Sequence, residues 1–320
     1  MLFHMIEKVY RNAVYSRADA DGSIFYFSAE DFDGLHQEPF VFVSSKGHKL
    51  QGYFYYYDTY VPERIIMFEH GMGSGHKAYM KEIERIARQG YLVFTYDHTG
   101  CTESGGESNG GFVHSLIDLN DAINALQKEE KYREKDISVV GHSWGGFSAL
   151  NIAAFHPEVS HIVAMAGFVS VSQILRQFFG GILSGAYKRI YEKEKLTYPE
   201  YIESDAISAL KKTDAKVLII HSKDDKTVSF QKHFAVMQKK LGNRGNIRFL
   251  ALDGKNHNPN FTREAVVYKD AFFADYQKKR KKKLLQTAEQ KEAFIALYDW
   301  NKMTEQDETV WNEIFETLEA

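Results

Sequence analysis

The chain has 320 residues, 44% of them apolar, which is enough for one large core or for one core with an added subdomain. Five prolines and 23 glycines exclude a fibrous or low-complexity class. The formal net charge is −3, and nucleic-acid binding would usually show a basic domain, so we expect no nucleic-acid partner.

Cys101 is the only cysteine, so no intramolecular disulfide can form, which fits a reducing compartment. Residues 1–8 lack the basic start, apolar stretch and small-residue cleavage site of a signal peptide. No window approaches the ~18 consecutive apolar residues of a membrane span. We therefore expect a cytoplasmic protein without a membrane span.

In chain order, residues 37–60 alternate like strands around a turn and predict an antiparallel hairpin rich in aromatic residues. Short apolar runs then alternate with segments of helical period. The expected strands are 64–68, 91–96, 137–140, 161–166, 217–220 and 247–252. The expected helices are roughly 76–89, 115–130, 144–155 and 229–241. This alternation indicates an α/β fold with a mostly parallel central sheet and helices on both faces.

Two segments do not fit the alternation. Residues 168–212 carry apolar side chains at helical spacing and predict a helical insertion over one end of the sheet. The tail from about Thr262 predicts two or three amphipathic helices. We expect its basic run 278–283 on a solvated face, with contact to an anionic surface or partner as the alternative. Residues 300–320 predict a last helix packed on the main domain. The expected organisation is thus a first core segment of residues 1–167, the insertion 168–212, and a second core segment with its tail, 213–320.

The segment 137–147 runs from an apolar strand through Gly141-His142-Ser143-Trp144-Gly145 into a helical stretch. Gly-x-Ser-x-Gly alone is a weak pattern, but this strand–turn–helix context supports a nucleophile elbow. The turn is so sharp that its serine takes a strained conformation and the flanking glycines cannot carry a Cβ. Such a turn presents the hydroxyl at the carboxyl edge of the sheet, beside a helix N-terminus. The competing interpretation is a glycine-rich turn with an incidental serine.

With this motif the sequence resembles the α/β-hydrolase family, in its branch of serine esterases, lipases and serine aminopeptidase-like enzymes, over about residues 40–260. The resemblance implies the α/β-hydrolase fold with a helical lid at 168–212. It also implies a triad in the order serine, acid, histidine, with each member on a loop after a strand. Ser143 is then the nucleophile.

The remaining triad members follow from matches to the family's loops. The turn after the strand 217–220 resembles the acid loop and aligns Asp225 with the acid, while Asp224 stays an alternative. Adjacent aspartates can also simply cap a helix. The loop after the last expected strand ends in Asn256-His257, which resembles the family's Gly-His or Asn-His. His257 is therefore the expected base among the 13 histidines.

The family forms its oxyanion hole from two backbone N–H groups. The resemblance assigns them to Trp144, after the nucleophile, and to Met72, in the glycine-rich loop 68–76. A loop of this kind can hold phosphate instead, but its spacing matches neither the P-loop nor the dinucleotide fingerprint. The loop 96–106 resembles another family segment and departs from it at Thr99 and Thr102, where arginine and glycine are usual.

These residues imply acyl transfer through an acyl-enzyme on Ser143, without a metal or organic cofactor. The apolar side chains of 168–212 favour a small or medium carboxylic ester as substrate, while an amide or peptide substrate stays open. An acyltransferase and a non-catalytic binding protein of the same fold stay open as well. The last helix could also form a homodimer contact.

Overall fold

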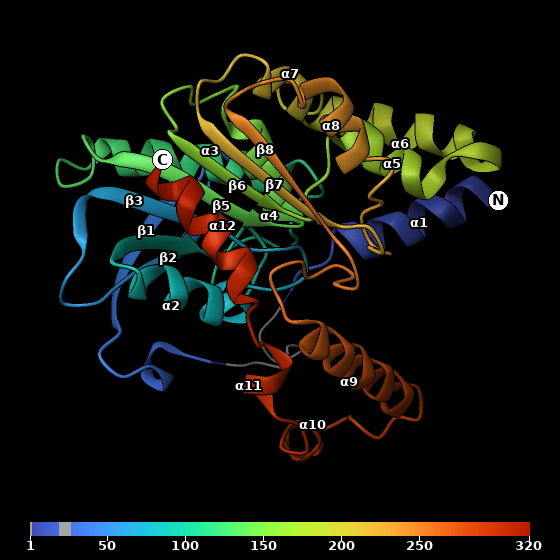
Figure 1. Cartoon of the computed structure of the whole chain (residues 1–320). Helices are drawn as coiled ribbons and strands as arrows, with labels where there is room; N and C mark the ends of the chain where they lie inside the picture. Colours follow the sequence, from blue (N-terminus) through green and yellow to red (C-terminus); the bar gives the residue numbers. More distant parts are fainter. Residues whose placement is uncertain (1, 19–26) are drawn as a thin grey trace.

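A computed structural model describes residues 2–18 and 27–320. Within them, one eight-stranded sheet forms the centre of the molecule (Figure 1). Its strands are β1 (His36–Val43), β2 (Lys49–Tyr56), β3 (Val61–Glu69), β4 (Tyr91–Tyr96), β5 (Asp136–His142), β6 (His161–Met165), β7 (Lys216–Ser222) and β8 (Ile247–Leu252). The expected hairpin and all six later strands are confirmed.

The order of the strands is β1-β2-β4-β3-β5-β6-β7-β8. β1 pairs antiparallel with β2, and β2 pairs antiparallel with β4, whereas all later pairs are parallel. Because parallel strands end at the same edge of a sheet, the loops after β3, β5, β7 and β8 meet at one edge. Every sequence-predicted site residue lies on these loops or at the start of the helix after β5.

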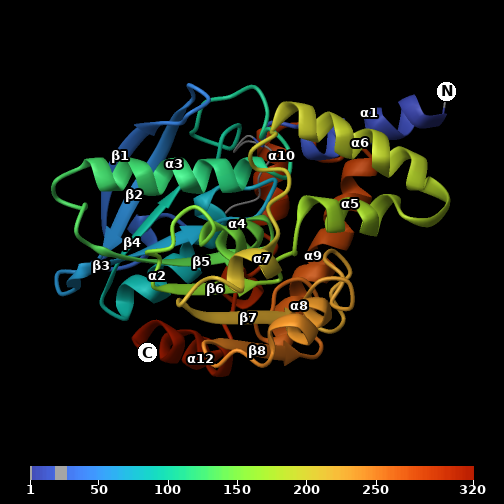
Figure 2. The ribbon, with the colours of Figure 1, turned by 90° about the horizontal axis from the view of Figure 1, so that it is seen from above.

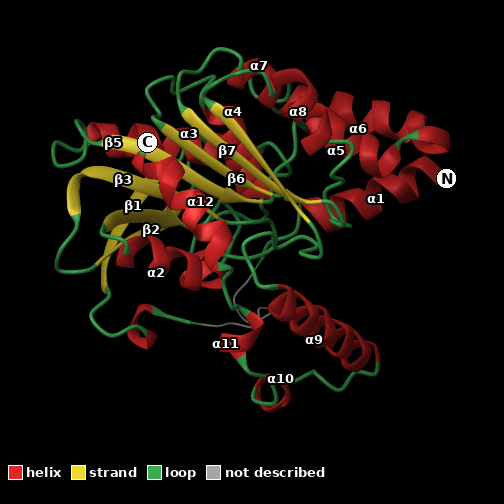
Figure 3. Cartoon of the chain, viewed as in Figure 1, coloured by secondary structure: helices red, strands yellow, loops and turns green. Residues whose placement is uncertain are grey.

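Helices cover both faces of the sheet, as the apolar alternation predicts (Figures 2 and 3). On β3, Ile65 and Met67 join one core, and Ile66 and Phe68 join the other. The first core takes side chains from α3 (His114–Lys128), α4 (Trp144–Ile152) and α8 (Phe234–Leu241). The second takes them from α2 (Met80–Arg88), which follows the short helix η3 (His76–Tyr79), and from the last helix of the chain.

The segment between β6 and β7 is helical, as expected. It holds α5 (Val171–Phe179), η4 (Gly181–Leu183), α6 (Ser184–Thr197) and α7 (Ala206–Leu210). We call residues 168–212 the cap segment. The sequence interpretation did not include α1 (Leu2–Val14), which contacts α6. Tyr10 and Tyr15 both donate their hydroxyls to Glu194 Oε1, at 2.9 and 2.5 Å, and so tie the N-terminal segment to the cap.

The tail contains more helices than the two or three predicted. The described tail has α9 (Arg263–Lys281), α10 (Ala288–Ile295), α11 (Trp300–Met303) and α12 (Glu308–Glu319). Residues 300–320 are not one helix, because Asp307 caps a new one by accepting from the Thr309 N–H at 2.9 Å. α12 packs on the sheet, while α9, α10 and α11 share a small separate core around Phe272.

The basic run 278–283 forms the end of α9 and the turn after it, and most of its side chains are exposed. This agrees with a solvated face. The division of the chain at 167/168 and 212/213 stays a prediction. No helix in the described ranges is long and apolar enough to cross a membrane.

Candidate active site

Ser143 lies between β5 and α4 with φ 57° and ψ −109°, a strained conformation for a residue with a Cβ. The neighbouring glycines allow this turn. A Cβ on Gly141 would lie 2.2 Å from the carbonyl oxygen of Gly145, and a Cβ on Gly145 would lie 2.1 Å from that of Glu69. Both distances are far inside van der Waals contact. The elbow geometry expected from the motif is therefore present.

Ser143, His257 and Asp225 form one continuous hydrogen-bonded chain. His257 Nε2 lies 2.8 Å from Ser143 Oγ, and His257 Nδ1 lies 2.8 Å from Asp225 Oδ2. Because an ionised carboxylate only accepts, Nδ1–H donates to Asp225, which leaves Nε2 to accept from the serine hydroxyl. His257 follows Asn256, which has φ 45°, a left-handed conformation that asparagine tolerates well. The three sequence-predicted residues thus meet, each from a different loop.

Asp225 is fixed from several sides. Its Oδ1 accepts from the backbone N–H groups of Thr227 at 2.8 Å and Val228 at 3.0 Å. His221 Nε2 lies 3.1 Å from Oδ2. Burial alone would raise the pKa of Asp225, but hydrogen bonds from His221 and His257 hold that pKa well below its usual range. The carboxylate therefore stays ionised at neutral pH.

Asp224, the alternative acid, bonds to the Ser222 side chain and to the backbone instead. It accepts from the Ser222 hydroxyl at 2.5 Å and from the N–H groups of Gly254 at 2.9 Å and Asn256 at 3.3 Å. These bonds join the loop after β7 to the loop that carries His257. Of the two adjacent aspartates, Asp225 is the one that contacts the imidazole.

Two residues without a predicted role connect the loops around Ser143. His142 Nε2 lies 2.7 Å from the His257 carbonyl oxygen, and His142 Nδ1 lies 2.9 Å from the Tyr79 hydroxyl. Since a carbonyl only accepts, Nε2–H donates and Nδ1 accepts from Tyr79. Burial and the charge of His257 lower the pKa of His142 to about 3, so its ring is neutral. Tyr79 also accepts from the Gly71 N–H at 3.1 Å. His142 thereby links the loop after β3 to the loop of His257.

Met72 and Trp144 both line the cavity beside Ser143. Trp144 is the first residue of α4, where a backbone N–H has no acceptor within its own helix. Its indole Nε1 donates to the Phe112 carbonyl at 2.8 Å and so fixes the start of the helix. Met72 follows Gly71, whose carbonyl accepts from the Ser74 hydroxyl at 2.9 Å.

A buried polar cluster lies behind these loops. The fully buried Glu69 lies 3.4 Å from His98 Nε2, and Asp118 lies 3.4 Å from His98 Nδ1. Burial raises the pKa of Glu69 to about 7. Thr99 donates both its N–H and its hydroxyl to Asp118, and Thr102 donates its hydroxyl to Asp97. The two departures from the family pattern therefore serve to hold this loop.

A cavity of about 1210 Å³ opens beside Ser143 and His257. The cap segment contributes Phe168, Ile174, Phe178 and Phe179, α1 contributes four residues, and the tail contributes residues of α9 and α11. Figure 1 shows α1 and α5 on one side of the carboxyl ends of the strands and α9 on the other. The contributions of α1 and the tail were missed, since neither carries a recognisable motif.

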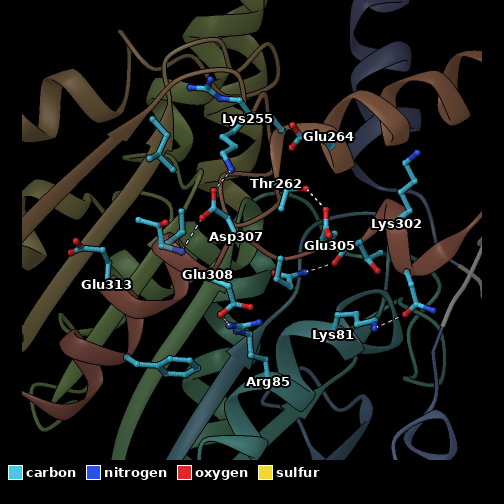
Figure 4. A pocket seen from close by; sticks show the side chains of 18 of the residues that line it. Lys81, Arg85, Lys255, Thr262, Glu264, Lys302, Glu305, Asp307, Glu308 and Glu313 are labelled. Carbon is cyan, nitrogen blue, oxygen red and sulfur yellow. Dashed lines mark hydrogen bonds and ion pairs between the residues drawn. The ribbon is translucent and has the colours of Figure 1, made fainter.

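A second cavity, of about 1230 Å³, lies between α2, β8 and the tail (Figure 4). Many of its charged groups pair with one another. Lys255 pairs with Asp307 and Arg85 with Glu308, while Thr262 donates to Glu305 at 2.9 Å. Pairing of this kind joins the tail to the core. Across the described ranges, no cluster of His, Cys, Asp and Glu side chains could hold a metal ion.

Comparison with known proteins agrees with the fold. Residues 61–205 match the family model described as serine aminopeptidase, S33. The chain superimposes on the esterase Pf2001 of Pyrococcus furiosus with a TM-score of 0.59 at 17% identity, covering 85% of this chain and 97% of that one. The sheet order, the elbow and these matches define the α/β-hydrolase fold. The chain therefore has the α/β-hydrolase fold, and parts of it are similar in sequence to serine aminopeptidases and to monoglyceride lipases.

Two relatives illustrate the range of sequence similarity. The uncharacterized protein YqkD of Bacillus subtilis is 23% identical over 287 residues, which cover 84% of this chain and 87% of that protein. The monoglyceride lipase of Rattus norvegicus is 31% identical over 123 residues, which cover 38% of each protein.

Proposed function

We propose that the protein is a serine hydrolase that cleaves a carboxylic ester of a small or medium substrate through an acyl-enzyme on Ser143. The observation that carries the proposal is the chain Ser143 Oγ–His257–Asp225, with both hydrogen bonds at 2.8 Å, at the wall of a cavity of about 1210 Å³. Such a chain can remove the serine proton only when Nε2 is unprotonated, and the ionised Asp225 favours that tautomer.

In the proposed reaction, Ser143 Oγ attacks the ester carbonyl carbon while His257 Nε2 takes its proton. The N–H groups of Met72 and Trp144 stabilise the oxyanion, and each donor is worth on the order of 3 kcal/mol. His257 then gives the proton to the leaving alcohol as the C–O bond breaks. Water, deprotonated by His257, attacks the acyl-enzyme and releases the acid and Ser143.

The cap segment is proposed to act as a lid over the acyl group. Ile174 and Leu175 are buried and fasten α5 to the core, whereas Phe178 is 47% exposed and lines the cavity. One helix thus supplies both an anchor and a wall for an apolar group. A cytoplasmic location stays a prediction from the sequence.

A fluorophosphonate probe tests the nucleophile, because it labels an activated serine. We expect Ser143→Ala to abolish labelling and hydrolysis of p-nitrophenyl butyrate without a change in melting temperature. Ser208→Ala, at an exposed serine of α7, is the matched control and should keep both. Labelling that persists in Ser143→Ala would overturn the assignment, and a wild type that is never labelled would favour a non-catalytic binding protein.

An amide substrate is the second candidate, favoured by the aminopeptidase description of the family model that matches residues 61–205. The same triad can cleave both bonds. Comparing kcat/KM for p-nitrophenyl esters with that for aminoacyl p-nitroanilides separates the two. Faster cleavage of the anilides would reverse our preference for the ester.

A further inference from the structure

The cavity beside Ser143 has two chemically different walls. The wall on the side of α1 and α5 is mostly apolar, with Ser16 and Arg17 lining the cavity just after the end of α1. Its apolar part is formed by Val9, Tyr10, Ala13, Val14, Ile174, Phe178 and Phe179. The wall on the side of α9 also has aromatic residues, among them Phe272, Phe273 and Tyr276, but it carries the charged residues Glu82, Lys269 and Asp270 together with the amides Asn258 and Asn260.

Lys269 on α9 is an ammonium group with few partners. Its Nζ donates to Asn258 Oδ1 at 2.8 Å and lies 4.8 Å from the centre of the Phe261 ring. Among the residues that the structure describes, no carboxylate oxygen lies within 4 Å of it. Burial lowers the pKa of Lys269 to about 8, so most molecules carry the charge at pH 7. An ammonium has three donors, so this group can donate further hydrogen bonds into the cavity.

Glu82 on α2 supplies the complementary acceptor. Its side chain is 3% exposed and accepts from Asn260 Nδ2 at 2.9 Å. Glu82 and Lys269 influence each other's pKa through space, although they form no direct ion pair. They also act on the groups around Ser143, because Lys269 helps to lower the pKa of His142 and Glu82 helps to raise that of Tyr79. Both residues line the same cavity as Ser143 and His257.

The position of His257 decides which end of a substrate meets this wall. His257 must protonate the leaving group, so the leaving group lies beside its ring. The chain after His257 passes through Asn258 and Asn260 and enters α9, which carries Lys269. The wall that carries Lys269 and Glu82 is thus on the leaving-group side, and the wall formed by α1 and α5 remains for the acyl group.

We propose that Lys269 and Glu82 form a subsite for an uncharged hydroxyl group on the leaving alcohol. The substrate class is then an ester of an apolar acid with an alcohol that carries at least one further hydroxyl. A hydroxyl can accept from Lys269 and donate to Glu82 at the same time, whereas an ammonium only donates and a carboxylate only accepts. Glu82 and Asp270, both on the cavity wall, already balance the charge of Lys269, so an anionic group is not required. The inference rests on the proposed ester hydrolysis.

Two matched esters test the subsite. In 2-hydroxyethyl octanoate and propyl octanoate, a hydroxyl replaces a methyl group and the rest of the molecule is the same. We expect the wild type to have a kcat/KM for the hydroxyethyl ester higher by on the order of tenfold, because the propyl ester leaves buried polar groups unpaired. Lys269→Met should reduce this ratio to about one, and Glu82→Gln should lower it less, since glutamine still accepts.

Lys278→Met, at an exposed position of the same helix outside the cavity, should keep the wild-type ratio. A wild-type ratio of one or below would overturn the subsite even if a variant failed to fold. A higher kcat/KM for carboxymethyl octanoate than for either ester would also overturn it, by assigning Lys269 to an anion. Failure of the proposed function looks different, because then neither ester nor p-nitrophenyl butyrate would be cleaved in a Ser143-dependent way.

Discussion

Replacing Asp307 by asparagine should destabilise the protein and disturb the loop of His257. Lys255, two residues before His257, has a side chain that is 6% exposed, and its ammonium pairs with Asp307 and donates to the Phe261 carbonyl (Figure 4). The substitution keeps the helix cap to Thr309 but leaves the buried ammonium without its counter-charge. Loss of one partner from a buried pair costs about 3–5 kcal/mol. Asp307 is 24% exposed and asparagine still accepts, so we expect about 2–3 kcal/mol.

Urea unfolding measures the loss of stability, and the rate of fluorophosphonate labelling under native conditions reports on the loop. We expect labelling to slow by on the order of tenfold, since a displaced base misaligns the serine. Lys255→Met/Asp307→Asn, which removes both charges, should be more stable than Asp307→Asn alone. Glu313→Gln, which breaks a more exposed ion pair of the same helix with Arg248, should cost less than about 1 kcal/mol. Wild-type stability and labelling in Asp307→Asn would refute the reasoning.

Three further predictions concern buried groups. Asp225→Asn should lower kcat/KM for p-nitrophenyl butyrate by about 10³–10⁴-fold, because the amide favours the wrong tautomer of His257; a loss below about tenfold would speak against its role. Burial raises the pKa of Glu69 from 4.5 to about 7, so native Glu69 keeps a proton that the unfolded chain loses. The stability that this proton contributes is complete below pH 4.5 and is lost as the pH rises to about 7. Between pH 4.5 and 8, the free energy of unfolding of the wild type, measured with urea, should therefore fall by about 3 kcal/mol more than that of Glu69→Gln. An equal fall in both proteins would contradict this. Glu194→Gln should cost about 1–2 kcal/mol and speed proteolysis within α1, since Tyr10 loses a charged acceptor; unchanged cleavage would exclude this tie.

The elements of the fold that follow a local pattern were predictable from the sequence. The predicted strands were short apolar runs, and their boundaries lie within a few residues of the boundaries in the structure. Ser143, Asp225 and His257 were located because each follows a strand in a motif with a steric reason, such as the glycines of the elbow. The order of the motifs along the chain was sufficient to place them at one edge of the sheet.

What could not be predicted depends on contacts between distant segments. Glu194 accepts from Tyr10, 184 residues away, and Asn260 donates to Glu82, 178 residues away. Neither pair has a spacing that a sequence pattern can reveal. His142 lay inside the elbow motif, but its bridge between Tyr79 and the His257 carbonyl depends on how three loops meet. The number of helices in the tail was underestimated because Asp307 starts a new helix within one apolar stretch.

The proposed chemistry of the site and its proposed selectivity therefore come from different segments of the chain. The groups proposed to act on the ester come from the loops of the sheet, which are held by glycine contacts and buried hydrogen bonds. The walls of the cavity come from α1, the cap segment and α9, which lie outside that framework. Exchanging Lys269 should change which alcohol is accepted, while exchanging Ser143 should abolish every ester alike. If a Lys269 substitution lowered kcat/KM for every ester by the same factor, as a Ser143 substitution should, the walls would not determine which alcohol is accepted.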